Sequence, residues 1–255
     1  MPDLDDLGRR LAAAYRSGTR IEAPSAEYDL SVEDAYRIQS AFIEDRTERG
    51  SSPVGYKLGF TNETVQDQYG VDEPAYGVLL DDTVLTEGTV SVSDLIDPRI
   101  EPEIAFVLSR PLSGQVAPYE VLASTRAIVP VIEIVDCRID GHLDAVDAIA
   151  DNALASKLVP GSTITDPTAN DVAMESVQVR IGGDPVESGT GTNVLDHPAR
   201  AVSWLAGTLS EQGEPIADGE IVSTGSLTSA ISVEPGDVVE ARFGSLGSVT
   251  IGVTQ

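Results

Sequence analysis

The chain has 255 residues, which is enough to bury a substantial core as one large domain or two small ones. Its 42 acidic and 16 basic side chains give a net charge of -26, spread along the sequence, which makes nucleic acid a poor partner. No apolar run of about 18 residues and no secretory start are present, and the single cysteine, Cys137, excludes an internal disulfide framework, so we expect a cytoplasmic protein without a membrane partner.

The first part of the chain has the spacing of amphipathic helices. Apolar residues recur at helical intervals between Leu4 and Gly18, which predicts a first helix. A second helix is predicted from Ser31, which forms an approximate capping box with Asp34, to Gly50.

The rest of the chain mixes short β-like runs with a few helices. Three further helices are predicted over residues 119–126, 144–158 and 198–212. The C-terminal third alternates or runs apolar between glycine turns, as strands do. Because the order lacks the regular alternation of a doubly wound sheet, we expect one α+β domain, in which a helical segment over 1–50 leads into residues 51–255.

Three glutamates stand in two runs that otherwise have the character of buried strands. Glu101 and Glu103 lie in RIEPEIAFVL, and Glu133 lies in AIVPVIEIVD. Alternate residues of a strand share a face, so Glu101 and Glu103 point the same way. Unpaired carboxylates among aliphatic side chains are costly, and a hard divalent cation such as Mg²⁺ or Mn²⁺ would remove that cost. We interpret the three glutamates as a metal site.

Two other interpretations of these glutamates stay open. They can pair with arginines, since Arg99 and Arg138 are close in the sequence. The two glutamates of the first run can also lie on a solvated sheet edge. Pro102 favours an edge or a bulge, because proline cannot donate to a sheet ladder.

Lysine is scarce in this chain, which makes each lysine informative. Only Lys57 and Lys157 occur, against fourteen arginines. Lys57 stands between Gly55 and Gly59, where the backbone can bend closely around a ligand. A bound cation nearby would lower the pKa of Lys57, which suits proton transfer near neutral pH. The other interpretation is an ordinary surface lysine.

The acidic excess also predicts a property of the whole molecule. Salt at molar concentration screens charge repulsion over a few ångströms. We therefore hypothesise that the protein is halophilic, with a surface adapted to high salt.

Two polar segments are further candidates for a site. Asp81 and Asp82 end a predicted strand, where paired acids form a turn or supply a catalytic acid. The hydroxyl-rich stretch STGSLTSA, residues 223–230, can hold a substrate carboxylate through N–H and hydroxyl groups, or form a tight turn.

In chain order, several of these segments resemble one known family. They are YKLGFTN, YGVDEPAYGVLLDD, PRIEPEIAFVL, PVIEIVDCRI, DAIADNA, HPARAVSWLA and STGSLTSAISVEPGD. Together they resemble the 2-keto-4-pentenoate hydratase family, which belongs to the fumarylacetoacetate hydrolase superfamily and includes the 4-oxalocrotonate decarboxylases. The resemblance implies a mixed β-sheet roll of the fumarylacetoacetate hydrolase C-terminal-domain type, with residues 51–255 as its metal-binding catalytic part.

The resemblance also implies roles for individual residues. Glu101, Glu103 and Glu133 match the family's Mg²⁺ or Mn²⁺ ligands. Lys57 matches the lysine of a K-x-G motif with a proton-transfer role, and Asp82 matches an acidic active-site residue.

Substrate contacts are expected from Leu58, Gly225 and Ser226. Hydratases of this group often have T-G-A-L-G-P in the last loop, whereas this chain has TGSLTS. The difference leans toward the decarboxylase-like members or toward hydratases of longer dicarboxylic substrates. Lys157 is either a second carboxylate partner or a surface residue.

The implied reaction is addition of water to a 2-hydroxy-2,4-dienoate, which gives a 4-hydroxy-2-oxo acid in the catabolism of aromatic-ring cleavage products. A 4-oxalocrotonate decarboxylase, an acylpyruvate hydrolase of the same superfamily and a catalytically silent subunit are the alternatives. The implied partners are a small 2-oxo or 2-hydroxydienoate substrate and further copies of the chain in a homo-oligomer, with a paired decarboxylase or hydratase as another option.

Overall fold

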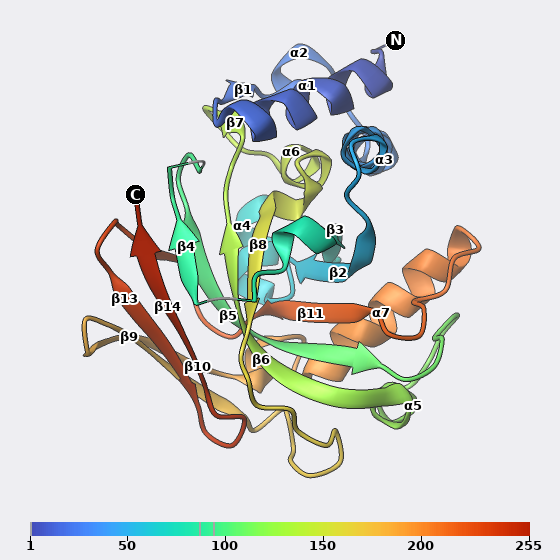
Figure 1. Ribbon diagram of the computed structural model, residues 1–255. Coiled ribbons are helices and arrows are strands. Elements are labelled where there is room, and N and C mark those ends of the chain that lie inside the picture. The colour runs from blue at the N-terminus through green and yellow to red at the C-terminus, as the bar shows by residue number, and fades with distance from the viewer. Residues whose placement is uncertain (1, 87, 94) are drawn as a thin grey trace.

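The computed structural model describes residues 2–86, 88–93 and 95–255. Two curled sheets form a roll, and helices cover one end and one side of it (Figure 1). The helices are α1 (Leu4–Ser17), α2 (Pro24–Glu27), α3 (Val32–Glu48), α4 (Glu63–Tyr69), α5 (Pro118–Ser124), α6 (Ala145–Ala150) and α7 (Pro198–Glu211), with short 3₁₀ turns η1 (Asp81–Thr83), η2 (Asn152–Leu154) and η3 (Gly191–Asn193).

The larger sheet has the strand order β3-β2-β11-β5-β6-β8, and β12 pairs with β5 beside this path. Its strands are β2 (Pro53–Gly59), β3 (Ala75–Leu80), β5 (Arg99–Leu108), β6 (Thr125–Val135), β8 (Ala155–Pro160), β11 (Ile221–Ser226) and β12 (Ile231–Ser232). Most pairs are antiparallel, but β11 runs parallel to β2.

The smaller sheet has the order β10-β9-β13-β14-β4, and a separate parallel pair joins β1 to β7. These strands are β1 (Ile21–Glu22), β4 (Thr89–Ser91), β7 (Ile139–Asp140), β9 (Ser176–Ile181), β10 (Asp184–Thr190), β13 (Val238–Phe243) and β14 (Ser248–Thr254). The predicted α+β roll with a helical N-terminal segment is thus confirmed.

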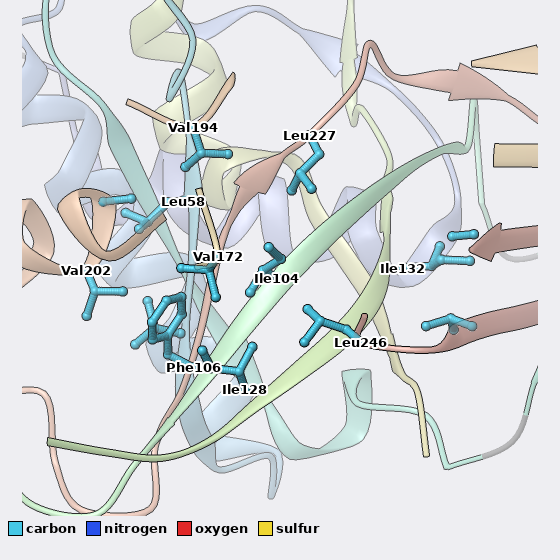
Figure 2. Close-up of a cluster of buried hydrophobic side chains, with 14 of the residues drawn as sticks. Leu58, Ile104, Phe106, Ile128, Ile132, Val172, Val194, Val202, Leu227 and Leu246 are labelled. Atoms are coloured by element: carbon cyan, nitrogen blue, oxygen red, sulfur yellow. The ribbon is translucent and has the colours of Figure 1, made fainter. Parts of the chain in front are cut away.

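The main core gathers the apolar faces of both sheets and of α7. Figure 2 shows part of it, with Ile104 and Phe106 of β5 close to Ile128 of β6. Because side chains alternate across a strand, the even-numbered residues of β5 enter this core. The odd-numbered residues, Glu101 and Glu103 among them, turn to the opposite face of the sheet. One face of β5 therefore belongs to the core, and the other face carries the two glutamates of the predicted metal site.

The N-terminal helices form a second, smaller core at one end of the roll, next to α6 (Figure 1). Leu11 of α1, Phe42 of α3 and Ile149 of α6 meet there. The predicted capping box of α3 is present, since Ser31 accepts from the N–H of Asp34 and the Asp34 carboxylate accepts from the N–H of Ser31. Both predicted N-terminal helices are confirmed.

One predicted helix is wrong. The segment 144–158 is helical only over α6, and it becomes strand β8 from Ala155 onward. Three successive residues, Asn152, Ala153 and Leu154, have positive φ angles of 55°, 49° and 62°. The left-handed region cannot continue an α-helix, so the chain turns there and enters the sheet.

Pro102 lies in the interior of the larger sheet, between β11 and β6. The register between β11 and β5 shifts between Ser223 and Ser226, so the bulge lies in β11, opposite the stretch from Ala105 to Glu103, whereas Pro102 is paired in register with Ile132 of β6. Pro102 therefore lies neither on a sheet edge nor in a bulge. It stands where the pairing of β5 with β11 ends at Glu103 and the pairing with β12 begins at Ile100, so its missing N–H leaves no ladder hydrogen bond unmade. No helix in the described part of the chain is long and apolar enough to cross a membrane.

Candidate metal centre and its cavity

The three predicted glutamates come together in space. Glu101 and Glu133 are direct cross-strand partners in β5 and β6, and Glu103 is the next residue on the same face of β5. One carboxylate oxygen from each lies within 4.8 Å of the other two. Glu103 and Glu133 are fully buried, and Glu101 is half-buried. The long β5–β6 hairpin therefore positions all three candidate ligands.

Strand β11 donates two hydrogen bonds to the Glu103 carboxylate. The Ser223 hydroxyl donates to Oε2 of Glu103 over 2.6 Å, and the Gly225 N–H donates to the same atom over 3.0 Å. Gly225 has a φ angle of 100°, and a Cβ atom there would lie 2.1 Å from Oγ1 of Thr61. Only glycine fits this close to Thr61. The two hydrogen bonds from β11 fix the orientation of the Glu103 carboxylate.

Lys57 of β2 supplies a positive charge beside these carboxylates. Its Nζ atom lies 3.1 Å from Oε2 of Glu133 and donates to the carbonyl of Ala153 over 2.9 Å. The lysine is 2% exposed, so the surface interpretation is wrong. Strand β2 and the left-handed turn at residues 152–154 position this ammonium group, which faces the carboxylates.

Three buried carboxylate oxygens lack a hydrogen-bond donor. Among the described residues, Oε1 of Glu103 and both oxygens of Glu133 have no hydrogen-bond partner, although Oε2 of Glu133 lies at ion-pair distance from Lys57. Buried oxygens of this kind need either a proton or a cation. Three carboxylates and one ammonium leave a local excess of negative charge, and oxygen ligands suit a hard divalent ion. The residues fit Mg²⁺ or Mn²⁺.

The pKa values of the three glutamates reflect the same excess of buried negative charge. Burial, opposed by Lys57, raises the pKa of Glu101 to about 7. Burial together with the charge of Glu133 raises the pKa of Glu103 well above its usual value, and burial also raises that of Glu133. For Lys57, burial works to lower the pKa, but the three carboxylates outweigh it and the pKa is raised. Without a metal, the cluster therefore holds protons that a cation would displace.

The arginines that could have neutralised these glutamates have other partners. Arg138 is buried and donates to the Asp151 carboxylate, with Nε 2.8 Å from Oδ1. Arg99 lies 3.6 Å from Asp97. The alternative in which arginines lock the glutamates is wrong, and Arg138 instead anchors the end of α6 ahead of the left-handed turn.

A cavity of about 770 Å³ opens beside the centre. Lys57 and Glu101 line it, together with the predicted substrate contacts Leu58 and Ser226. Loop residues 227–230 complete one wall. Its volume suits a small organic acid.

Two predicted site residues lie elsewhere or act differently. Asp82 is in η1, where its half-exposed carboxylate pairs with Arg46 over 2.6 Å, and it does not line the cavity. The structure therefore does not bring Asp82 to the site, because the strand that carries it ends away from the glutamates. Gly225, predicted to bind substrate, uses its N–H on Glu103. Lys157, whose role was left open, is paired with Ile134 and so faces away from Glu133.

Several site residues escaped the sequence analysis. Ser223 was predicted only as part of a hydroxyl-rich stretch, although its hydroxyl donates a hydrogen bond to Glu103, one of the predicted metal ligands. Ala153 contributes a backbone oxygen, which leaves no signal in its side chain. Arg20 lines the cavity from the N-terminal segment, far from every other site residue in the sequence.

Comparison with known proteins agrees with this geometry. The sequence profile of the fumarylacetoacetate (FAA) hydrolase C-terminal family matches residues 51–254. The chain is 40% identical over 250 residues to a 2-keto-4-pentenoate hydratase from Paraburkholderia xenovorans (strain LB400), which covers 96% of this chain and 93% of that protein. It is 37% identical over 225 residues to a 4-oxalocrotonate decarboxylase from Pseudomonas sp. (strain CF600), covering 87% and 85% of the two chains.

A solved structure extends the comparison to three dimensions. The 4-oxalocrotonate decarboxylase from Pseudomonas putida G7, complexed with magnesium and adipate, superimposes with a TM-score of 0.95 at 32% identity. The match covers 98% of this chain and 97% of that one.

The roll and its buried acidic centre define a metal-dependent enzyme of the fumarylacetoacetate hydrolase superfamily. More narrowly, the chain belongs to the family of 2-keto-4-pentenoate hydratases and 4-oxalocrotonate decarboxylases. The family, the enzyme class and the Mg²⁺ or Mn²⁺ cofactor class predicted from the sequence are confirmed.

Proposed function

We propose that the protein is a divalent-metal-dependent hydratase, which converts a 2-hydroxy-2,4-dienoate into a 4-hydroxy-2-oxo acid during the breakdown of aromatic-ring cleavage products. The observation that carries this proposal is the buried Lys57 ammonium beside three glutamates at one small-molecule cavity. The 40% identity to a 2-keto-4-pentenoate hydratase over nearly the whole chain supports the choice of hydration.

Each group in the centre has a task in this reaction. Glu101, Glu103 and Glu133 would hold a divalent cation, which supplies a Lewis acid for the carboxylate and the 2-oxygen of the substrate. The Lys57 ammonium donates a proton to the terminal carbon and regains one from the 2-hydroxyl group, which moves the double bond into conjugation with the new ketone. Water then adds at C4.

The cavity wall orients the substrate for these steps. The Ser226 hydroxyl faces the carboxylate end, since Ser226 lines the cavity next to Lys57. Leu58 borders the cavity through its backbone, because its side chain points to the opposite face of β2 and packs in the main core. The buried setting of the centre strengthens each of these polar contacts, because little water competes for them.

Decarboxylation of a 2-oxo-3-enedioate such as 4-oxalocrotonate is the second candidate. It is favoured by the TM-score of 0.95 with a decarboxylase whose complex contains magnesium and the dicarboxylate adipate. An acylpyruvate hydrolase has less support. His142 is highly exposed and pairs with Asp144, and His197 caps α7, so neither histidine can activate water in the cavity.

A paired assay separates these reactions. With Mg²⁺ or Mn²⁺, the purified protein should consume 2-hydroxypenta-2,4-dienoate, with loss of its ultraviolet absorbance. Release of CO₂ from 4-oxalocrotonate without dienoate turnover would select the decarboxylase. A protein that leaves both compounds unchanged would contradict the proposal and point to the catalytically silent subunit.

A further inference from the structure

Arg138 holds both ends of the left-handed turn that faces Lys57. Ahead of the turn, its Nε donates to Oδ1 of Asp151 over 2.8 Å, and its Nη2 donates to the Asp151 carbonyl over 2.8 Å. Beyond the turn, its Nη1 donates to the carbonyl of Ala155 over 3.3 Å. The backbone N–H of Arg138 also donates to Oδ2 of Asp151, over 2.9 Å. One planar guanidinium group therefore fixes the distance between the two residues that flank positions 152–154.

The turn needs this support because its backbone is strained. Asn152, Ala153 and Leu154 follow one another with positive φ angles, which residues other than glycine rarely adopt. Such conformations persist only where the surrounding structure holds them, and they concentrate at functional sites. Arg138 and Asp151 are both buried, so water does not compete for the hydrogen bonds that hold the turn.

The turn presents one group to the reaction centre, which is the carbonyl of Ala153. It accepts from Nζ of Lys57 over 2.9 Å, and Oε2 of Glu133 lies 3.1 Å from the same Nζ. An ammonium group has three N–H donors. In the described parts of the chain no third group accepts from Lys57, which lines the cavity, so one donor is left for the substrate.

The Ala153 carbonyl also keeps the ammonium group away from competing acceptors. Oε1 of Glu103 and Oε1 of Glu133 are buried and have no hydrogen-bond partner among the described residues. Carboxylates attract an ammonium group strongly where water is excluded. If the Ala153 carbonyl moved away, Lys57 would shift toward these oxygens. Because Ala153 lines the cavity, its carbonyl holds the ammonium group on the cavity side.

We propose that Arg138 is a positioning residue for Lys57, because it holds the turn whose Ala153 carbonyl keeps the ammonium group at the cavity. The inference rests on the proposed function, which gives the proton transfer to Lys57. Arg138 does not line the cavity, so it acts through the turn. Its Cζ lies over the ring of Tyr15 in α1, 5.6 Å from the centroid, so the N-terminal segment, outside the stretch matched by the family profile, helps to hold it.

A double variant removes the contacts of Arg138 without leaving a charge unpaired. Arg138→Met/Asp151→Asn deletes both charges of the buried pair, which often leaves stability unchanged, and the asparagine can still accept from the N–H of residue 138. We expect kcat to fall by about 10²-fold, because the proton donor is misplaced. KM should stay close to its wild-type value, since the three glutamates of β5 and β6 keep their places.

Nuclear magnetic resonance of Lys57 separates positioning from a general loss of structure. The chain contains only two lysines, so in the Lys157→Met background protein labelled with ¹³C at the lysine Cε gives a single signal, from Lys57. In protein saturated with Mg²⁺, this signal should shift in the double variant, because the ammonium group has changed its partner. The circular dichroism spectrum should be unchanged.

The matched control removes a similar ion pair that contacts the same aromatic ring. Arg46 of α3 lies over the ring of Tyr15, 4.1 Å from the centroid, and pairs with Asp82 over 2.6 Å. Among the described residues, neither of these charged side chains forms a hydrogen bond with the turn at 152–154. Arg46→Met/Asp82→Asn should therefore leave kcat and the Lys57 signal unchanged.

A second variant decides the question if the double variant does not fold. Arg138→Lys keeps the positive charge opposite Asp151, but a compact ammonium group cannot reach both ends of the turn, so kcat should fall by at least about tenfold. Wild-type kcat in Arg138→Lys would then overturn the proposal.

For a folded double variant, wild-type kcat or an unshifted Lys57 signal would overturn the proposal. So would a control pair that has the same effects as the double variant. If the wild-type protein turns over neither the dienoate nor 4-oxalocrotonate, the proposed function fails, whereas the Lys57 signal still tests whether Arg138 positions the lysine.

Discussion

Lys57 and Glu133 show how a single pair sets the chemistry of the centre. The two side chains lie 3.1 Å apart and are almost fully buried. An ion pair in such surroundings strongly disfavours removal of either partner. Lys57 is therefore both a structural counter-ion to the carboxylates and the proposed proton carrier.

The variant Lys57→Met separates these two roles. Loss of the ammonium group removes proton transfer, so turnover should fall by about 10²–10⁴-fold. Metal affinity should be retained or increased, because a competing positive charge has left the carboxylates. Turnover and Mn²⁺ binding measured on the same preparation check this, with Lys157→Met as the control on the opposite face of β6–β8. Normal turnover in Lys57→Met would remove the assignment.

At the scale of elements, the left-handed turn between α6 and β8 determines where Lys57 points. The Asn152 side chain donates to the carbonyl of Val78 over 3.0 Å and accepts from its N–H over 2.8 Å, so it extends the pairing of β3. Next to it, Ala153 presents its carbonyl to Lys57. The backbone strain of the turn is offset by these contacts.

Replacement of Asn152 by alanine tests this turn. Asn152→Ala leaves two backbone groups of Val78 unpaired and keeps a positive φ angle on a residue that tolerates it poorly. We expect the free energy of unfolding to fall by about 2–4 kcal/mol, and turnover to fall with it. Chemical denaturation measures the first effect. A variant as stable and as active as the wild-type protein would show that the turn does not position Lys57.

The elements that the sequence predicts well are those with a periodic signal. The apolar runs of β5 and β6 reveal the strands, and the glutamates within these runs reveal the face that carries the metal ligands. Both can be predicted because the alternation of side chains along a strand is a local property of the backbone. The end of α6 was missed, since three left-handed residues have no characteristic composition. Arg20 and Asp82 show the other limit, because only tertiary packing decides which charged side chain reaches a cavity.

For the whole molecule, the carboxylate cluster predicts how stability depends on pH. The pKa of Glu101 is raised from 4.5 to about 7, so the metal-free folded state holds a proton that the unfolded state releases. A raised carboxyl pKa makes the folded state less stable as the pH rises from about 4.5 through about 7. Because protons on the carboxylates compete with the metal, the increase in Tm caused by Mg²⁺ should be larger near pH 8, above this range, than near pH 5. Equal increases at both pH values would contradict the raised pKa values.

The net charge of -26 predicts a second property of the whole molecule. Repulsion among exposed carboxylates opposes the compact state, and salt screens it over a few ångströms at molar concentration. We expect the thermal unfolding midpoint in molar KCl to lie several degrees above that in dilute buffer, as about 1 kcal/mol of stabilisation would give. Identical midpoints would refute a halophilic adaptation.

The direct test of the account is a titration of the metal-free protein with Mn²⁺, followed by the loss of the free-ion electron paramagnetic resonance signal. The wild-type protein should bind one ion per chain at high affinity. The variant Glu103→Gln, which keeps the shape of the side chain, should lose this binding while its circular dichroism spectrum is unchanged. Tight stoichiometric binding that persists in Glu103→Gln would show that the buried glutamates do not form the metal centre.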